Sequence, residues 1–239
     1  MEKSKFEKFI GKYNLGGSCE SVLFNVNNKT LSTRAISDDK NVLCEVTAPS
    51  MGIPDGAYPV YETVKLRSLL NVLGDVLDVK VKQANEKPVG LTFSDPSTEV
   101  TFVLADQSVI PATPDLKTLP NFDLTIEMDE QFINTFVKAK GALSEVETFS
   151  VMSDGNTKSA DVVLGYSSLN TNRVRIRANI ENVCNFNPIN FSARYLREIL
   201  VANKDAKGGK LEISSKGLAR TSFTVDNITS TYYLVQVSI

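Results

Sequence analysis

A helix followed by short strands occurs in two matching copies along this chain, and this repeat constrains the fold more than any other feature. Residues 66–70 (Leu-Arg-Ser-Leu-Leu) align with residues 196–200 (Leu-Arg-Glu-Ile-Leu), an offset of 130 (196 − 66). Apolar residues within 6–10 align with those within 133–137, an offset of 127 (133 − 6). Two nearly equal offsets indicate a helix–strands–helix–strands unit used twice. The chain of 239 residues is long enough for two such domains.

Most of the sequence between the repeated helices consists of short β-type runs. In residues 174–178 (Val-Arg-Ile-Arg-Ala) apolar and charged residues alternate, which is typical of a strand with one buried face. Turn-forming residues such as Asn27–Asn28 and Asp154–Gly155–Asn156 separate the runs. The sequence therefore predicts an α+β fold in which each of two repeated domains packs two helices on antiparallel sheets.

The segment 106–119 is the expected connector between the two domains. It contains several prolines and shows little periodicity, as linkers do. We place the boundary near residue 115, which gives an N-terminal domain at 1–115 and a C-terminal domain at 116–239.

Apolar residues recur at helical spacing in four segments, which are 3–13, 65–73, 130–141 and 192–204. Each segment carries an apolar stripe that should pack on one face of a sheet. The stripes are Phe6, Phe9, Ile10 and Tyr13; Leu66, Leu69, Leu70 and Leu73; Ile133, Phe136 and Val137; and Tyr195, Leu196, Ile199 and Leu200. The pair Ser4 and Glu7 predicts a capping box at the first helix, and Asp129 predicts an N-cap at the third.

These four helices are basic, although the chain as a whole is not. They contain eleven basic and three acidic residues, whereas the rest of the chain contains 15 basic and 25 acidic ones, within totals of 26 and 28. A polyanion would be attracted to the helix faces and repelled by the remaining surface. For any single helix, a basic face that is simply solvated is the alternative interpretation.

The residue types that are absent or rare exclude several kinds of chemistry. With no histidine, the chain has no His metal ligand and no Ser/His or Cys/His nucleophile pair. Its three cysteines form no CxxC pair, so we expect neither a disulfide framework nor structural zinc, and we expect a reducing, cytoplasmic location. No apolar run is long enough to cross a bilayer, and the N-terminal segment lacks the pattern of a signal peptide. Enzymes that use only carboxylates, lysine or tyrosine stay open, but we expect no enzyme activity, no metal, no cofactor and no membrane association.

The C-terminal part of the chain resembles a known module. Residues 190–200 form a helix with its lead-in, a Lys/Gly-rich turn follows, and strand-like runs at 210–214, 219–225 and 231–237 complete the order. This order is similar to the C-terminal module of DNA sliding clamps, the ring-shaped processivity factors of replicative DNA polymerases. The helix at 65–73 fits the same pattern in the first copy. The resemblance covers essentially the whole chain and is closest to the two-domain clamps of tailed phages of the T-even kind.

This resemblance implies a homotrimer in which six domains close a ring, with helices inside and sheets outside. Cations on the helices would then contact the phosphates of duplex DNA without reading its sequence. A phage-encoded clamp would work in the host cytoplasm. The residues that would contact DNA are Lys5, Lys8, Lys12, Lys65, Arg67, Lys138, Arg194 and Arg197, with Lys204 and Lys207 at the rim.

The same resemblance implies an apolar pocket that captures short peptide tails of the DNA polymerase and of the clamp loader. The pocket would lie near the connector and the C-terminal strand. Its candidate residues are Val109, Ile110, Pro111, Tyr232, Tyr233 and Leu234. A packed connector and a core strand would contain the same residue types, so both interpretations stay open.

The residues alone also leave two other classes of function open. A β-rich viral structural or assembly protein would use the same basic helices to bind acidic partners. The acidic residues Asp123, Glu127, Asp129 and Glu130 fit a carboxylate-based, metal-dependent nuclease. A solvated strand followed by a helix start would contain the same carboxylates, because the helix dipole favours them there.

Overall fold

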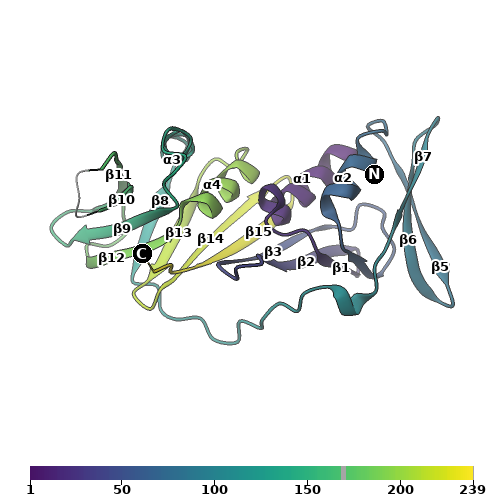
Figure 1. Cartoon of the computed structure of the whole chain (residues 1–239), viewed down its shortest axis with the longest axis horizontal. Coiled ribbons are helices and arrows are strands. Elements are labelled where there is room, and N and C mark those ends of the chain that lie inside the picture. Colours follow the sequence, from purple (N-terminus) through teal and green to yellow (C-terminus); the bar gives the residue numbers. More distant parts are fainter. Residues whose placement is uncertain (168–170, 239) are drawn as a thin grey trace. The chain divides into compact units, whose positions relative to one another are not determined.

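The computed structural model describes residues 1–167 and 171–238, and it divides into two compact units (Figure 1). Unit 1 comprises Met1–Asp38, Cys44–Pro114 and Thr224–Ser230. Unit 2 comprises Asp39–Leu43, Asp115–Phe223 and the chain from Thr231 onward. Along the sequence the main change from one unit to the other therefore falls between Pro114 and Asp115, and each unit also takes a short segment from the other half of the chain.

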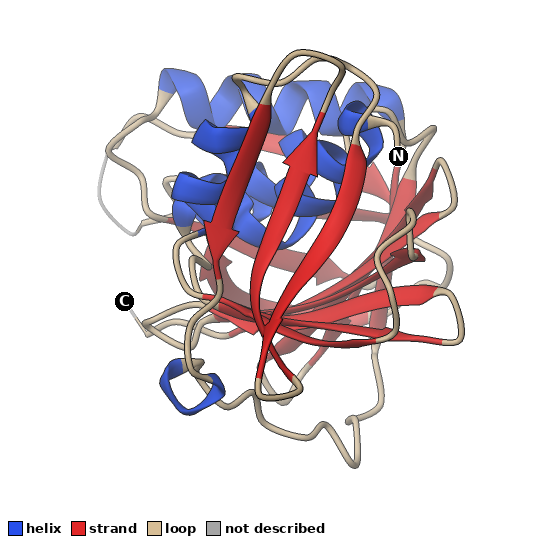
Figure 2. Ribbon diagram, turned by 90° about the vertical axis from the view of Figure 1, so that its right-hand side faces the viewer, coloured by secondary structure: helices blue, strands red, loops and turns tan. Residues whose placement is uncertain are grey.

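Unit 1 contains two groups of antiparallel strands. In the first group the order is β4-β1-β2-β3, and in the second it is β5-β6-β7. The strands are β1 (Val22–Asn27), β2 (Thr30–Ile36), β3 (Val42–Pro49), β4 (Gly56–Val60), β5 (Asp78–Ala84), β6 (Lys87–Ser94) and β7 (Glu99–Val103). Figure 2 shows β5, β6 and β7 on the side toward the viewer. The predicted turn between β1 and β2 is present, and Asn28 and Lys29 both have positive φ, as a tight hairpin turn requires.

Two helices of unit 1, α1 (Lys3–Asn14) and α2 (Thr63–Leu70), lie on one side of β1 and β2 (Figure 1). The predicted apolar stripe of α1 is fully buried. The rings of Phe6, Phe9 and Tyr13 pack edge-on against Phe24 of β1, with centroids 5.5 to 6.1 Å apart. Aromatic pairs in this geometry add to the free energy gained by burial.

The predicted capping box at the start of α1 is wrong. The helix begins two residues earlier than a Ser4 cap requires, its N-cap is Glu2, and no side chain caps it. Backbone pairing holds this end instead: the Lys3 amide donates to the Asp75 carbonyl at 2.9 Å, and the Leu77 amide donates to the Met1 carbonyl at 2.8 Å. Backbone partners more than seventy residues away in the sequence therefore take the place of a local cap.

Unit 2 also contains two groups of antiparallel strands. One has the order β11-β10-β9-β12, and the other has β8-β13-β14-β15. The strands are β8 (Leu124–Met128), β9 (Thr148–Asp154), β10 (Ser159–Leu164), β11 (Val174–Asn179), β12 (Asn185–Ser192), β13 (Gly209–Ser214), β14 (Leu218–Val225) and β15 (Ile228–Val235). The alternation predicted in residues 174–178 is present in β11, where Ile176 and Ala178 are buried and the two arginines are exposed.

The helices of unit 2 are α3 (Glu130–Ala142) and α4 (Ala193–Ala202). The predicted N-cap of α3 is confirmed, because Asp129 Oδ1 accepts from the Phe132 amide at 2.7 Å. Ser192 caps α4 by accepting from the Tyr195 amide at 3.3 Å. The predicted stripe of α4, comprising Tyr195, Leu196, Ile199 and Leu200, is buried. With helices packed on antiparallel sheets in both units, the predicted α+β class is confirmed.

Within the described ranges, none of the helices combines the length and the apolar character needed to span a membrane.

Candidate nucleic-acid interface

The clearest exposed cations of unit 1 lie on α2. Leu66 and Leu70 point into the core and are fully buried, while Lys65 and Arg67, on either side of Leu66 in the sequence, are exposed. The helix starts at Thr63 because Glu20 reaches its N-terminus, where its Oε2 accepts from the Val64 amide at 2.9 Å. Neither Lys65 nor Arg67 has a side-chain hydrogen bond or ion pair among the described residues, so both charges are available to a ligand.

The cations of α1 are partly engaged within the fold. Lys5 pairs with Glu2 at 2.9 Å, and Lys8 pairs with Asp226, on the turn between β14 and β15, at 2.6 Å. The hydrogen bond from Lys8 is the main reason why the pKa of Asp226 is lowered. Exposed pairs of this kind are worth little free energy, so they do not prevent either lysine from moving to a phosphate.

Lys12 is not at the surface, where the sequence had placed it. Its exposed fraction is 1%, because it lies one helical turn after Phe9, on the flank of the buried stripe. Its charge still acts locally, since Lys12 contributes to lowering the pKa of Asp226. We therefore remove Lys12 from the residues that could contact a phosphate directly.

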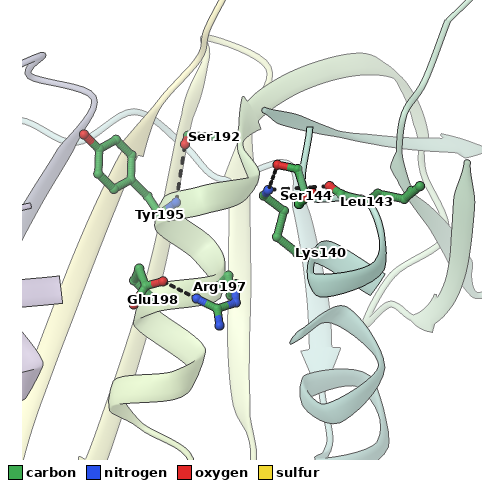
Figure 3. Close-up of polar contacts among 7 residues, drawn as sticks. All are labelled: Lys140, Leu143, Ser144, Ser192, Tyr195, Arg197 and Glu198. Atoms are coloured by element: carbon green, nitrogen blue, oxygen red, sulfur yellow. Dashed lines mark hydrogen bonds and ion pairs between the residues drawn. The ribbon is translucent and has the colours of Figure 1, made fainter. Parts of the chain in front are cut away.

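On α3 the structure separates two lysines that are close in sequence. Lys138 is exposed and has no side-chain hydrogen bond or ion pair among the described residues. Lys140 turns back to the helix end, where its Nζ donates to the carbonyls of Ser144 at 2.7 Å and Leu143 at 3.5 Å (Figure 3). A cation at this position satisfies carbonyl groups that the helix leaves unpaired.

The arginines of α4 are exposed or half-buried and have local partners. Arg197 forms a short ion pair with the neighbouring Glu198 (Figure 3). The guanidinium of Arg194 lies 4.9 Å from the centre of the Tyr195 ring. Lys204 and Lys207, just beyond the end of the helix, are exposed. Planar, pre-positioned guanidinium groups are suited to phosphate contacts.

Taken within each unit, these exposed cations lie on helices whose opposite sides pack on a sheet, or, for Lys204 and Lys207, just beyond the end of α4. Their long side chains end in point charges or planar guanidinium groups, which are suited to phosphate oxygens. Such a surface attracts a polyanion through phosphate contacts and does not distinguish sequences.

The residues expected to form a peptide pocket fall in different units. Val109, at the end of a short 3-10 turn, is exposed, as is Pro111, and both belong to unit 1. Tyr232 and Leu234 belong to the buried part of β15 in unit 2, where Asn203 Nδ2 donates to the Tyr232 hydroxyl at 2.9 Å. The core-strand interpretation therefore holds for Tyr232 and Leu234, and the pocket stays a prediction.

Two of the four carboxylates that fitted a nuclease, Asp123 and Asp129, are used within the fold. Asp123 accepts from the amide and the hydroxyl of Ser215, both at 2.7 Å, and these hydrogen bonds lower its pKa. Asp129 caps α3. In the part of the chain that the structure describes, no group of three or more Cys, Asp or Glu residues is arranged to hold a metal ion.

One surface was missed by the reasoning from sequence. Asp55, Glu86 and Asp106 line a common cleft in unit 1, although they are far apart in the chain. No motif or spacing in the sequence connects them. Only the pairing of the strands brings them together.

The order of helices and antiparallel sheets in the two units is the fold of DNA sliding clamps, and the resemblance noted in the sequence is confirmed at the level of fold. The structure is similar to the crystal structure of Proliferating Cellular Nuclear Antigen from Entamoeba histolytica, with a TM-score of 0.76 over 99% of this chain and 96% of that chain. The sequences are 12% identical. No protein-family model matches the chain, and comparison with curated proteins finds no match.

Proposed function

We propose that this chain is a sliding clamp that encircles duplex DNA as a closed homotrimer and tethers a DNA polymerase for processive synthesis. The observation that carries the proposal is the clamp fold combined with exposed cations on the helices of both units. In a ring with helices inside, Lys65, Arg67, Lys138, Arg194 and Lys204 would line the hole. Because they contact only phosphates, no register along the duplex would be preferred and the ring would slide.

Edge strands support ring closure. In the described residues β7 pairs only with β6, and β11 pairs with β10 at the end of its sheet order. Val103 at the end of β7 is 74% exposed, which is unusual for an aliphatic residue on an edge strand. Pairing of β7 in one copy with β11 in the next would cover both edges, and a head-to-tail contact of this kind generates rings.

The polymerase and the clamp loader would bind through short peptide tails at the connector and the C-terminal strand. The exposed Val109 and Pro111, with the half-buried Ile110, are the part of the predicted pocket that is accessible. In this proposal the chain acts as a scaffold and not as an enzyme, with domains at 1–115 and 116–239.

The experiment that tests the proposal is retention on DNA with blocked ends. The protein is incubated with linear duplex so that rings thread onto it, the ends are then blocked with streptavidin, and the salt concentration is raised. A topologically linked ring stays bound at high salt, whereas a protein held by phosphate binding alone dissociates. Cutting the duplex between the blocks should release the protein.

Two controls make the result decisive. DNA that is blocked before the protein is added should retain none at high salt. Release at high salt from DNA that is still blocked would contradict a closed ring and would favour a protein that binds acidic partners through its helices. Degradation of the DNA in the presence of Mg²⁺ would instead favour the nuclease.

A further inference from the structure

Unit 1 contains a cleft of about 670 Å³ between the edge strand β4 and the hairpin formed by β5 and β6. The cleft is closed at one end by the chain that leaves β7. There, the Leu104 amide donates to the Val89 carbonyl and the Ala105 amide donates to the Pro59 carbonyl, both at 3.0 Å. From this end the cleft extends along β4 to Gly56 and along the hairpin to Glu86 at its tip.

One wall of the cleft is an unpaired strand edge. The Leu23 carbonyl accepts from Thr33 Oγ1 of β2 at 3.0 Å, so it points away from β4. Leu23 is opposite Pro59, whose own carbonyl points out to Ala105. The direction of the backbone N–H and C=O groups alternates from one residue to the next along a strand. Ala57 is two residues before Pro59, so its N–H and C=O also point away from β1 and into the cleft. Pro59 has no N–H, so at this edge of β4 Ala57 is the residue that offers both a backbone donor and a backbone acceptor to an added strand.

The rim of the cleft is acidic and its floor is partly apolar. Asp55, Glu86 and Asp106 surround it with one opposing cation, Lys87, which helps to lower the pKa of Asp106 after the bonds from Ser108. Val89 is 40% exposed on the hairpin side. A nucleic acid is repelled by such a rim, whereas a basic segment of polypeptide is attracted to it.

We propose that this cleft binds an extended, basic peptide segment of a partner protein. The segment adds a short strand at the edge of β4 through the N–H and C=O of Ala57. It places lysine or arginine side chains among Asp55, Glu86 and Asp106, and an apolar side chain over Val89. The inference rests on unit 1 alone, so its failure would leave the proposed clamp function untouched.

The test uses the full chain and a fluorescein-labelled peptide with the repeat Lys-Val-Lys-Val-Lys, measured by fluorescence anisotropy. A Glu-Val-Glu-Val-Glu peptide is the probe of opposite charge and should not bind. Neutralising the rim should weaken binding of the basic peptide about tenfold, because charge-assisted hydrogen bonds no longer form. The neutralised variant carries Asp55→Asn, Glu86→Gln and Asp106→Asn.

A matched control removes the same number of charges from exposed positions of unit 1 outside the cleft. It carries Asp75→Asn, Asp78→Asn and Glu99→Gln, and it should bind the peptide as the original chain does. A second variant, Val89→Lys, places a cation in the cleft and should also weaken binding. If the control loses as much affinity as the rim variant, or if amide NMR shifts on peptide binding fall outside residues 55–59, 86–89 and 104–107, the proposal is overturned.

Discussion

At the scale of single residues, the availability of a charge depends on what surrounds it. Lys65 and Arg67 are exposed and have no ion pair among the described residues, whereas Lys12 on a similar helix is buried. Arg197 and Lys8 lie between these extremes, because each has a carboxylate partner. The strength of DNA binding should therefore follow the exposed cations of α2 more closely than the total charge of the helices.

Reversing the charge of α2 tests this directly. The double variant Lys65→Glu and Arg67→Glu should bind duplex DNA more weakly, and the slope of log affinity against log salt should fall by about one for each phosphate that the variant no longer neutralises. Reversal of Lys80 and Lys82 on β5 is the control and should leave the slope unchanged. Equal weakening in the two variants, measured by anisotropy over a range of salt concentrations, would contradict the assignment of α2 to the DNA face.

Asp95 provides a residue-scale prediction about pH. Its carboxylate accepts from the amides of Gly74, Ser97 and Thr98 at 2.7 to 2.8 Å, and these bonds lower its pKa to about 2. The unfolded value is about 3.9, so this carboxylate stabilises the folded state above pH about 4, and the stabilisation is lost as the pH falls toward 2.

The variant Asp95→Asn should therefore unfold at a lower temperature than the original chain at pH 7, with a difference that narrows as the pH falls from about 4. Thermal melts at several pH values measure this difference. A difference that is the same at pH 7 as at pH 2 would show that the ionised form of Asp95 does not matter to the fold.

At the scale of elements, the helices begin by different means. Asp129 caps α3 within its own turn, whereas α2 is capped by Glu20 and α1 by backbone pairing with Asp75. Local caps are readable from sequence because the cap and its partner amide are three residues apart. Caps from distant residues are not, which explains why the cap of α3 was predicted correctly, whereas the cap predicted for α1 was wrong and the cap of α2 was not predicted.

The cap of α3 can be tested alone. Asp129→Ala should lower the free energy of unfolding by about 1 kcal/mol, since the Phe132 amide loses its partner. Asp129→Asn keeps an acceptor oxygen and should cost much less. Urea unfolding followed by circular dichroism measures both, and equal losses in the two variants would mean that the charge, and not the hydrogen bond, supports the helix.

At the scale of the whole molecule, the proposal depends on copies of the chain closing a ring. A trimer of 26.2 kDa chains should appear by light scattering as a single species of about 79 kDa (three times 26.2). Ring closure should be most sensitive to a charge introduced at the exposed edge of β7, because a buried charge without a partner is costly at an interface.

The variant Val103→Lys should shift the protein from trimer to monomer while its circular dichroism spectrum stays the same. Val76→Lys is the matched control, since Val76 is 71% exposed and lies outside every strand. A trimer that survives Val103→Lys at low micromolar concentration would remove β7 from the ring contact.

The sequence by itself determined the α+β class, the positions of the four helices to within about three residues, and the basic character of those helices. These features depend on the spacing of apolar and charged residues along a few turns of chain, which is local information. Tertiary structure alone decided that Lys12 is buried, that Lys8 meets Asp226 218 positions later, and that three distant carboxylates share one cleft. The burial of Lys12 depends on what packs beside α1, and the other two features depend on which strands pair. Strand pairing joins residues whose separation in the sequence carries no signal.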